Sequence, residues 1–202
     1  MADKLFSVGC VMREIGRVVK LQVQTGPLKQ GPNREQYQPV NLLEVPILEI
    51  TARGVVGWQG ETTIIDVHHQ DHPRATGRKG HTLSFNFTSH YEVIRGRYGE
   101  HVFTGCGGDN VVFAAASTIT LADLQGELVL EIQTGERGHV LLPTIATPCL
   151  SYSRYILNHP APTPAQLKET LQFLHDGQRG FYADWQGQPV WIRPGDRLLR
   201  LI

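Results

Sequence analysis

The chain has 202 residues, of which 41% are hydrophobic and 19% are charged, a composition typical of a folded globular protein. Lys plus Arg and Asp plus Glu both number 19, so the formal net charge is zero. This balance disfavours nucleic acids and anionic membranes as partners, because both normally select proteins with a basic surplus. We find neither a signal-peptide pattern nor an apolar run of the ~20 residues that a spanning helix needs, and expect a cytoplasmic protein.

Strand patterns fill the first two-thirds of the chain. Residues 15–24 alternate apolar and polar side chains, and the polar segment 29–39, with two prolines and a glycine, predicts a surface loop. A second strand is predicted within 42–50 despite Pro46, which suits a strand start or an edge. Segment 62–67 predicts a short, buried strand. Further strands are expected at 81–87, 111–113, 117–121, 127–133, 138–142, 181–184, 190–192 and 198–202.

Three helices are predicted between these strands. Thr88 or Ser89 caps the first, which runs to Tyr98 and is closed by Gly99. Residues 148–157 form a short second helix, and the third begins near Pro162 and runs to about residue 175. Many short strands with 21 glycines and 12 prolines predict a mainly β barrel or sandwich with a few helices, in a single domain over 1–202.

The three cysteines, Cys10, Cys106 and Cys149, are few and odd in number, which indicates a reducing compartment and single thiols rather than a disulfide scaffold. Cys149 follows Pro148 at the start of the second predicted helix, where unpaired N–H groups and the helix dipole favour a thiolate. A thiolate attacks sulfur donors and binds soft metals. The alternative is an inert, buried cysteine that acts as a small hydrophobe.

Two polar segments are candidates for ligand binding. The glycine-rich segment 104–110 (TGCGGDN) lets backbone amides approach a ligand, although a tight strand connection explains it equally well, and it lacks the Lys-Ser/Thr ending of a P-loop. Segment 66–72 (DVHHQDH) holds three histidines and two aspartates, as in zinc sites, or else is a solvated loop. The candidates for an anion site are Arg78, Lys79, Arg95, Arg97 and Arg179.

The order of these segments resembles that of the MOSC domain, which is named from the C-terminal part of molybdenum cofactor sulfurase. The segments that carry the resemblance are 16–19 (GRVV), 53–57 (RGVVG), 66–69 (DVHH), 89–91 (SHY), 107–110 (GGDN), 148–149 (PC), 178–182 (QRGFY) and 193–197 (RPGDR). The match covers residues 16–201. It departs from the family at Asp109, where Glu is usual, and at Gln70, where many members have glycine.

The resemblance implies a distorted β-barrel of the MOSC, or PK β-barrel-like, type with the cysteine at its mouth. It implies molybdenum cofactor (molybdopterin) as the bound group and Cys149 as both the catalytic residue and the molybdenum ligand. The residues implied to bind the cofactor are Asp66, His68, His69, Tyr91, Gly108, Asp109, Asn110 and Arg179. We therefore expect the His-rich segment and the 107–110 loop to line one pocket with Cys149.

Two related functions follow from the resemblance. Either Cys149 carries sulfane sulfur as a persulfide for a metal–sulfur cluster or for cofactor sulfuration, or the bound cofactor reduces N-hydroxylated compounds. Because the chain shows no pyridoxal-phosphate domain, the expected partner is a sulfur-donor desulfurase or an electron-donor protein. Two other classes remain open: a non-catalytic module that only passes on its cargo, and a zinc-dependent hydrolase that uses His68, His69, Asp71 and His72.

Overall fold

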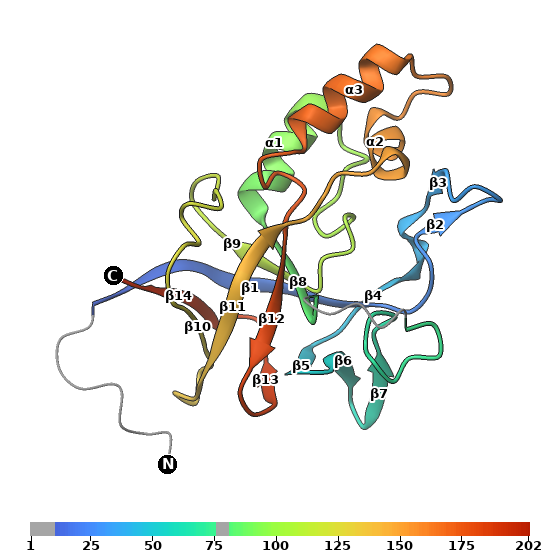
Figure 1. The fold of residues 1–202 in the computed structure, drawn as a ribbon. Coiled ribbons are helices and arrows are strands. Elements are labelled where there is room, and N and C mark those ends of the chain that lie inside the picture. Colours follow the sequence, from blue (N-terminus) through green and yellow to red (C-terminus); the bar gives the residue numbers. More distant parts are fainter. Residues whose placement is uncertain (1–10, 76–80) are drawn as a thin grey trace.

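The computed structural model describes residues 11–75 and 81–202, so Cys10, Arg78 and Lys79 lie outside the described residues (Figure 1). The α-helices are α1 (Thr88–Tyr98), α2 (Leu150–Leu157) and α3 (Pro164–Phe173). The barrel strands are β1 (Met12–Gln24), β8 (Leu83–Phe87), β9 (Val111–Ala114), β10 (Leu128–Glu131), β11 (Arg137–Ile145), β12 (Phe181–Gln186) and β14 (Arg197–Leu201). The remaining strands are β2 (Lys29–Gln30), β3 (Gln36–Tyr37), β4 (Leu42–Glu44), β5 (Ile47–Thr51), β6 (Gly54–Gln59), β7 (Thr62–Ile65) and β13 (Val190–Ile192).

Seven strands close a barrel in the order β1-β14-β10-β11-β12-β8-β9 and back to β1. Closure depends on the length of β1, whose first half pairs with β14 and whose second half pairs with β9. The β8–β9 pair is parallel, whereas the other neighbours in the barrel are antiparallel, so the sheet is mixed. The predicted fold class, mainly β with a few helices on a distorted barrel, is therefore confirmed.

Gly16 explains why β1 can cross from one neighbour to the other. A Cβ at this position would lie 2.9 Å from both the Cβ of Phe113 and the carbonyl oxygen of Ala114 on β9. The register with β14 also shifts between Glu14 and Gly16. A β-bulge bends and twists its strand, and the missing side chain admits the close approach of β9.

The three helices gather at one end of the barrel, away from the small sheet β13-β5-β6-β7 (Figure 1). Two hydrophobic clusters follow this division. The larger cluster fills the barrel and includes the inward side chains of β5 and β13, such as Leu48, Ile50 and Ile192. The smaller cluster lies under the helices and is centred on Tyr91, Tyr152 and Cys106.

Local signals predicted the helices well. Helix α3 begins at an N-cap, Thr163, that forms a full capping box with Gln166 and is followed by Pro164. Helix α1 spans Thr88–Tyr98 with Gly99 as its C-cap, as predicted, but the predicted capping by Thr88 or Ser89 was wrong: its N-cap is Phe87, and no side chain caps it. Helix α2 begins at Leu150 with Cys149 as its N-cap.

The segment 29–39 lies largely at the surface, as predicted, but it is not a loop throughout. The segment contains the hairpin β2–β3, in which Lys29 pairs with Tyr37, and the Tyr37 ring is buried in the cluster under the helices. One proline and polar residues make up the turn of this hairpin, residues 31–35 (GPNRE), so the local pattern resembles a loop although one aromatic side chain anchors it. Tertiary burial of Tyr37 therefore overrides the local signal.

The strand predicted at 117–121 was also wrong, because side chains satisfy its backbone groups. The Ile119 N–H donates to Nε2 of His90 at 3.1 Å, and the Thr120 N–H donates to the Asp123 carboxylate at 2.9 Å. Such local bonds offer the backbone an alternative to a ladder.

Two more strand predictions need correction. The strand expected within 42–50 is divided into β4 and β5 around Pro46, which cannot donate a ladder hydrogen bond. The segment 62–67, expected to be buried, forms the edge strand β7, whose Thr62, Thr63 and Ile65 are exposed. No helix within the described residues is long and apolar enough to cross a membrane.

Candidate functional site

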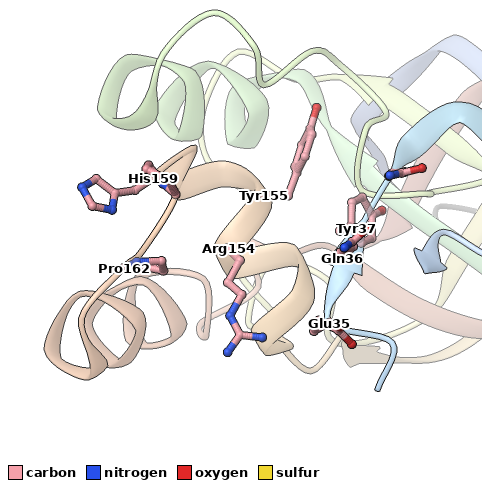
Figure 2. A pocket seen from close by; sticks show the side chains of 9 residues that line it. Glu35, Gln36, Tyr37, Arg154, Tyr155, His159 and Pro162 are labelled. Carbon is pink, nitrogen blue, oxygen red and sulfur yellow. The ribbon is translucent and has the colours of Figure 1, made fainter. Parts of the chain in front are cut away.

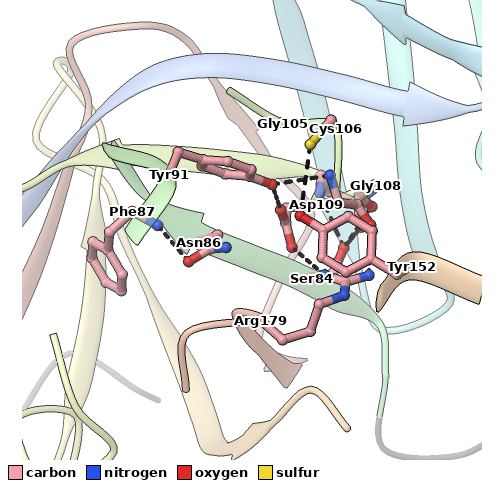
Figure 3. Close-up of polar contacts among 12 residues, drawn as sticks. Ser84, Asn86, Phe87, Tyr91, Gly105, Cys106, Gly108, Asp109, Tyr152 and Arg179 are labelled. Atoms are coloured by element: carbon pink, nitrogen blue, oxygen red, sulfur yellow. Dashed lines mark hydrogen bonds and ion pairs between the residues drawn. The ribbon is translucent and has the colours of Figure 1, made fainter. Parts of the chain in front are cut away.

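A buried polar network fixes the glycine-rich loop that precedes β9 (Figure 3). Arg179 donates from Nη2 to the Gly107 carbonyl at 2.6 Å and pairs through Nη1 with the Asp109 carboxylate at 3.4 Å. The Tyr91 hydroxyl donates to the other oxygen of Asp109 and accepts from the Gly107 N–H at 3.1 Å. Tyr91 and Arg179, which are far apart in the sequence, thus fix the backbone of the loop together with its own Asp109.

Two glycines are required for this arrangement. A Cβ on Gly107 would stand 2.8 Å from the Tyr91 hydroxyl and 2.9 Å from Nη1 of Arg179, and Gly108 has a φ of +87°. Glycine adopts positive φ without steric cost, whereas other residues do not. The loop therefore needs glycine for contact with its own network, whether or not a ligand approaches it.

An aromatic layer covers the network on the side of the helices. The Arg179 guanidinium stacks 4.7 Å from the centre of the Tyr152 ring, and Tyr152 meets Tyr37 edge-on at 5.1 Å. The Tyr37 hydroxyl donates to the Cys106 carbonyl at 2.8 Å. Burial raises the pKa of Asp109, while the Arg179 charge and the Tyr91 hydrogen bond oppose this rise. The Arg179 charge is therefore the main interaction that favours the charged form of this buried carboxyl.

Cys106 lies inside this layer and is fully buried. Its Sγ is 3.6 Å from the Tyr152 hydroxyl. Burial raises the pKa of the Cys106 thiol to about 11. Cys106 is thus a protonated, enclosed thiol at neutral pH, which is the environment of an inert cysteine.

Cys149 has a different setting. It is the N-cap residue of α2, in an extended conformation, and its carbonyl accepts the first helical hydrogen bond from the Ser153 N–H at 2.9 Å. Its side chain is half-buried and packs against the cluster that contains Cys106 and Tyr152. Cys149 thus packs against the same cluster under the helices that holds Cys106, Tyr37 and Tyr152.

The His-rich segment is joined to the glycine loop through Asp66. This carboxylate is fully buried and accepts hydrogen bonds from the Gln24 N–H at 2.7 Å, the His68 N–H at 2.9 Å and Nδ2 of Asn110 at 3.0 Å. Nδ1 of His68 also lies 2.9 Å from Asp66, while the His68 ring is mostly exposed. Asn110 is itself fixed by Ser84 at 2.7 Å. Asp66 thus organises both segments.

The other histidines of the His-rich segment contact residues close to the segment. His69 is buried against Gly54, and burial lowers its pKa. Nδ1 of His69 accepts from the Asp71 N–H at 3.2 Å, and Nδ1 of His72 accepts from the Arg74 N–H at 3.1 Å. Over residues 11–75 and 81–202, His, Cys, Asp and Glu side chains nowhere form a group of three that could hold a metal ion. The side-chain arrangement does not support the zinc-hydrolase interpretation.

The candidate residues thus fall into two connected sets. Tyr91, Gly108, Asp109 and Arg179 form or adjoin the loop network, and Cys149 packs against the same cluster. The second set contains Asp66, His68 and His69, and Asn110 links it to the first. Whether these residues bind a cofactor stays a prediction.

Sequence reasoning missed Tyr37 and Tyr152, which surround Arg179 and Cys106. Tyr152 stands three residues after Cys149 on α2, so a helical reading of that segment contained a signal for it. Tyr37 gave no local signal, because it lies in a polar, proline-containing segment.

Two open cavities adjoin α2. One, of about 580 Å³, lies beside the first turn of the helix and is lined by Lys29, Asn33, Arg34, Glu35, Leu150, Ser151 and Arg154. The other, of about 540 Å³, runs between β3 and the α2–α3 connection and shares Glu35 and Arg154 with the first (Figure 2). Both volumes are in the range of small-molecule sites.

No protein-family model and no curated protein matches the sequence. Solved structures share the fold. The chain is similar to the YuaD protein from Bacillus subtilis, with a TM-score of 0.59, 12% identity, and coverage of 95% of this chain and 97% of that one. A crystal structure described as a hypothetical protein has a TM-score of 0.55 and 12% identity, covering 93% and 69%. Identities this low establish the fold alone.

Proposed function

We propose that this chain is a MOSC-type protein in which Cys149 takes up sulfane sulfur as a persulfide and passes it to a metal–sulfur centre or a cofactor. The fold is the barrel that the MOSC resemblance implies. The observation that carries the proposal is the contrast between the two described thiols: Cys149 is partly accessible at a helix N-cap, whereas Cys106 is enclosed.

The chemistry needs only a nucleophilic thiolate and a persulfide-bearing donor protein. The Cys149 thiolate attacks the outer sulfur of the donor persulfide, and the bond between the two donor sulfurs breaks. The inner sulfur leaves with the electron pair as the donor's thiolate. In the second step a nucleophile of the acceptor attacks the outer sulfur of the Cys149 persulfide. The sulfur–sulfur bond breaks, and Cys149 leaves as a thiolate. Cys149 stands at the N-cap of α2, and its side chain makes no hydrogen bond to the backbone N–H groups of the first turn.

A second candidate, reduction of N-hydroxylated compounds with bound molybdenum cofactor, is favoured by the 580 Å³ cavity. Lys29, Arg34 and Arg154 bring three cations against one carboxylate to a cavity that reaches the residues directly after Cys149. Such a cavity fits the phosphate of an anionic cofactor, and a thiolate is a suitable soft ligand for its metal. When bound, the cofactor supplies electron transfer to the substrate, with electrons from a donor protein.

In either case the polar network has a positioning role. Arg179, Asp109 and Tyr91 fix the glycine loop, including Gly108, while Asp66 holds Asn110 and His68. We propose that His68 and His69 orient the cargo through hydrogen bonds rather than hold a catalytic metal. A reducing cytoplasm, which keeps Cys149 free, is part of the same proposal.

The test is the metal content of protein produced in cells that make molybdenum cofactor, measured together with its intact mass. Molybdenum that is lost in Cys149→Ser and reduced in Arg154→Glu supports the cofactor branch. A mass increase of one sulfur atom that is lost in Cys149→Ser and kept in Cys106→Ser supports the carrier branch. Stoichiometric zinc that survives Cys149→Ser contradicts both.

A further inference from the structure

The small sheet β13-β5-β6-β7 has one face in the core and one face turned outward. Leu48, Ile50, Val190 and Ile192 point inward and are fully or nearly fully buried. Because side chains alternate along a strand, the next residues of each strand point away from the core. The outward set, called here the outer face, is Ile47, Glu49, Thr51, Val56, Trp58, Thr63, Ile65 and Trp191.

The strand register places the outer face in two rows. Trp191 pairs with Glu49, Glu49 with Val56 and Val56 with Ile65, so these four side chains form a continuous row. Ile47, Trp58 and Thr63 form the neighbouring row. Five of the eight residues are apolar, two of them tryptophans, and Trp191 and Ile65 are 43% and 38% exposed. A contiguous apolar patch with aromatic residues is typical of a protein interface.

Charge on and beside the outer face is self-complementary. Glu49 is the charged member of the set, and its carboxylate accepts a hydrogen bond from the Trp58 indole at 3.1 Å. Arg193 is exposed and directly follows Ile192, the last residue of β13. Extending the β13–β5 register by one residue would set Arg193 opposite Ile47, at the end of the second row and diagonal to Glu49. On this extension the face has an anion on β5 and a cation at the end of β13.

We propose that the outer face is the interface of a homodimer with two-fold symmetry. The two-fold axis lies in the plane of the face and is the perpendicular bisector of the line from Glu49 to Arg193. Rotation about it places Arg193 of each copy opposite the partner's Glu49. The same operation brings Trp191 against the partner's Trp191, close to the axis. Such an isologous contact uses one patch twice and closes at two copies. The proposal is independent of the function of Cys149, because the face belongs to the small sheet and not to the helical end.

The test is the mass of the protein in solution, measured by light scattering after size exclusion over a series of concentrations. The expected mass is twice the chain mass of 22.5 kDa. Trp191→Glu, Glu49→Arg and Arg193→Glu should each give monomers, and the double variant Glu49→Arg with Arg193→Glu should restore the dimer. Circular dichroism of each variant separates lost association from lost folding.

Phe103→Glu is the matched control, because Phe103 is 42% exposed but lies in the connection between α1 and β9. It should leave the dimer unchanged. A monomeric wild-type protein at every concentration overturns the proposal. So does a dimer that survives Trp191→Glu in folded protein, or a charge-swapped double variant that stays monomeric.

Discussion

Arg179→Met is the most informative change in the polar network, because it leaves the Asp109 carboxylate buried without its cation. The Asp109 side chain is 2% exposed and that of Arg179 is 12% exposed, so solvent replaces little of the lost interaction. Breaking a buried ion pair from one side costs about 3–5 kcal/mol. With a urea dependence of about 2 kcal/mol per M, the unfolding midpoint should fall by about 2 M.

The assay is urea unfolding followed by tryptophan fluorescence, with two comparison variants. Adding Asp109→Asn to Arg179→Met removes the unpaired charge and should recover a large part of the loss. Arg97→Met removes a guanidinium that stacks 4.6 Å from the Phe173 ring and pairs with Glu169 at the surface. Exposed pairs contribute up to about 1 kcal/mol, so this control should change little. An Arg179→Met variant as stable as Arg97→Met would refute the role assigned to the network.

The same variant has a defined pH dependence. Burial raises the pKa of Asp109, and the Arg179 charge opposes that rise, so removing Arg179 raises the pKa further. A carboxyl whose pKa is higher in the folded than in the unfolded state takes up a proton on folding. Its contribution to stability is present at low pH and is lost as pH rises through the folded-state pKa. The stability difference between wild type and Arg179→Met should therefore be smaller in mild acid than at neutral pH.

Two further predictions concern accessibility and packing. In a Cys10→Ser background, iodoacetamide should modify Cys149 well before Cys106, because burial both encloses the Cys106 thiol and raises its pKa to about 11. Peptide mass spectrometry measures the order of labelling. Faster labelling of Cys106 would contradict the structure. Gly138→Ala should destabilise the folded state by about 1–3 kcal/mol, because the new methyl group meets the Trp185 ring across the β11–β12 pair. A thermal unfolding midpoint equal to that of the wild type would show that the ring moves aside without cost.

The sequence predicted those parts of the fold whose signals are local. The alternation over 15–24 identified the body of β1, and Thr163-Pro164 with Gln166 identified the start of α3. Pro148 with the helical pattern after it placed Cys149 at the start of α2. Each depends on interactions within a few residues, so one segment contains the necessary information.

The parts that the sequence did not predict depend on distant contacts. Tyr37 is buried because α2 supplies Tyr152 and Tyr155 beside it, more than a hundred residues later. The strand expected at 117–121 does not form, because His90 on α1 takes the Ile119 N–H. Similarly, nothing near Arg179 in the sequence indicated that it pairs with Asp109.

The measurement that tests the central claim most directly is the site of sulfur loading. Reduced wild-type, Cys149→Ser and Cys106→Ser proteins are incubated with a persulfide donor, and the mass of each cysteine-containing peptide is read. One added sulfur atom is expected on the Cys149 peptide in the wild type and in Cys106→Ser, and none in folded Cys149→Ser. Loading that persists in Cys149→Ser and disappears in Cys106→Ser would contradict this expectation and assign the chemistry to the glycine loop.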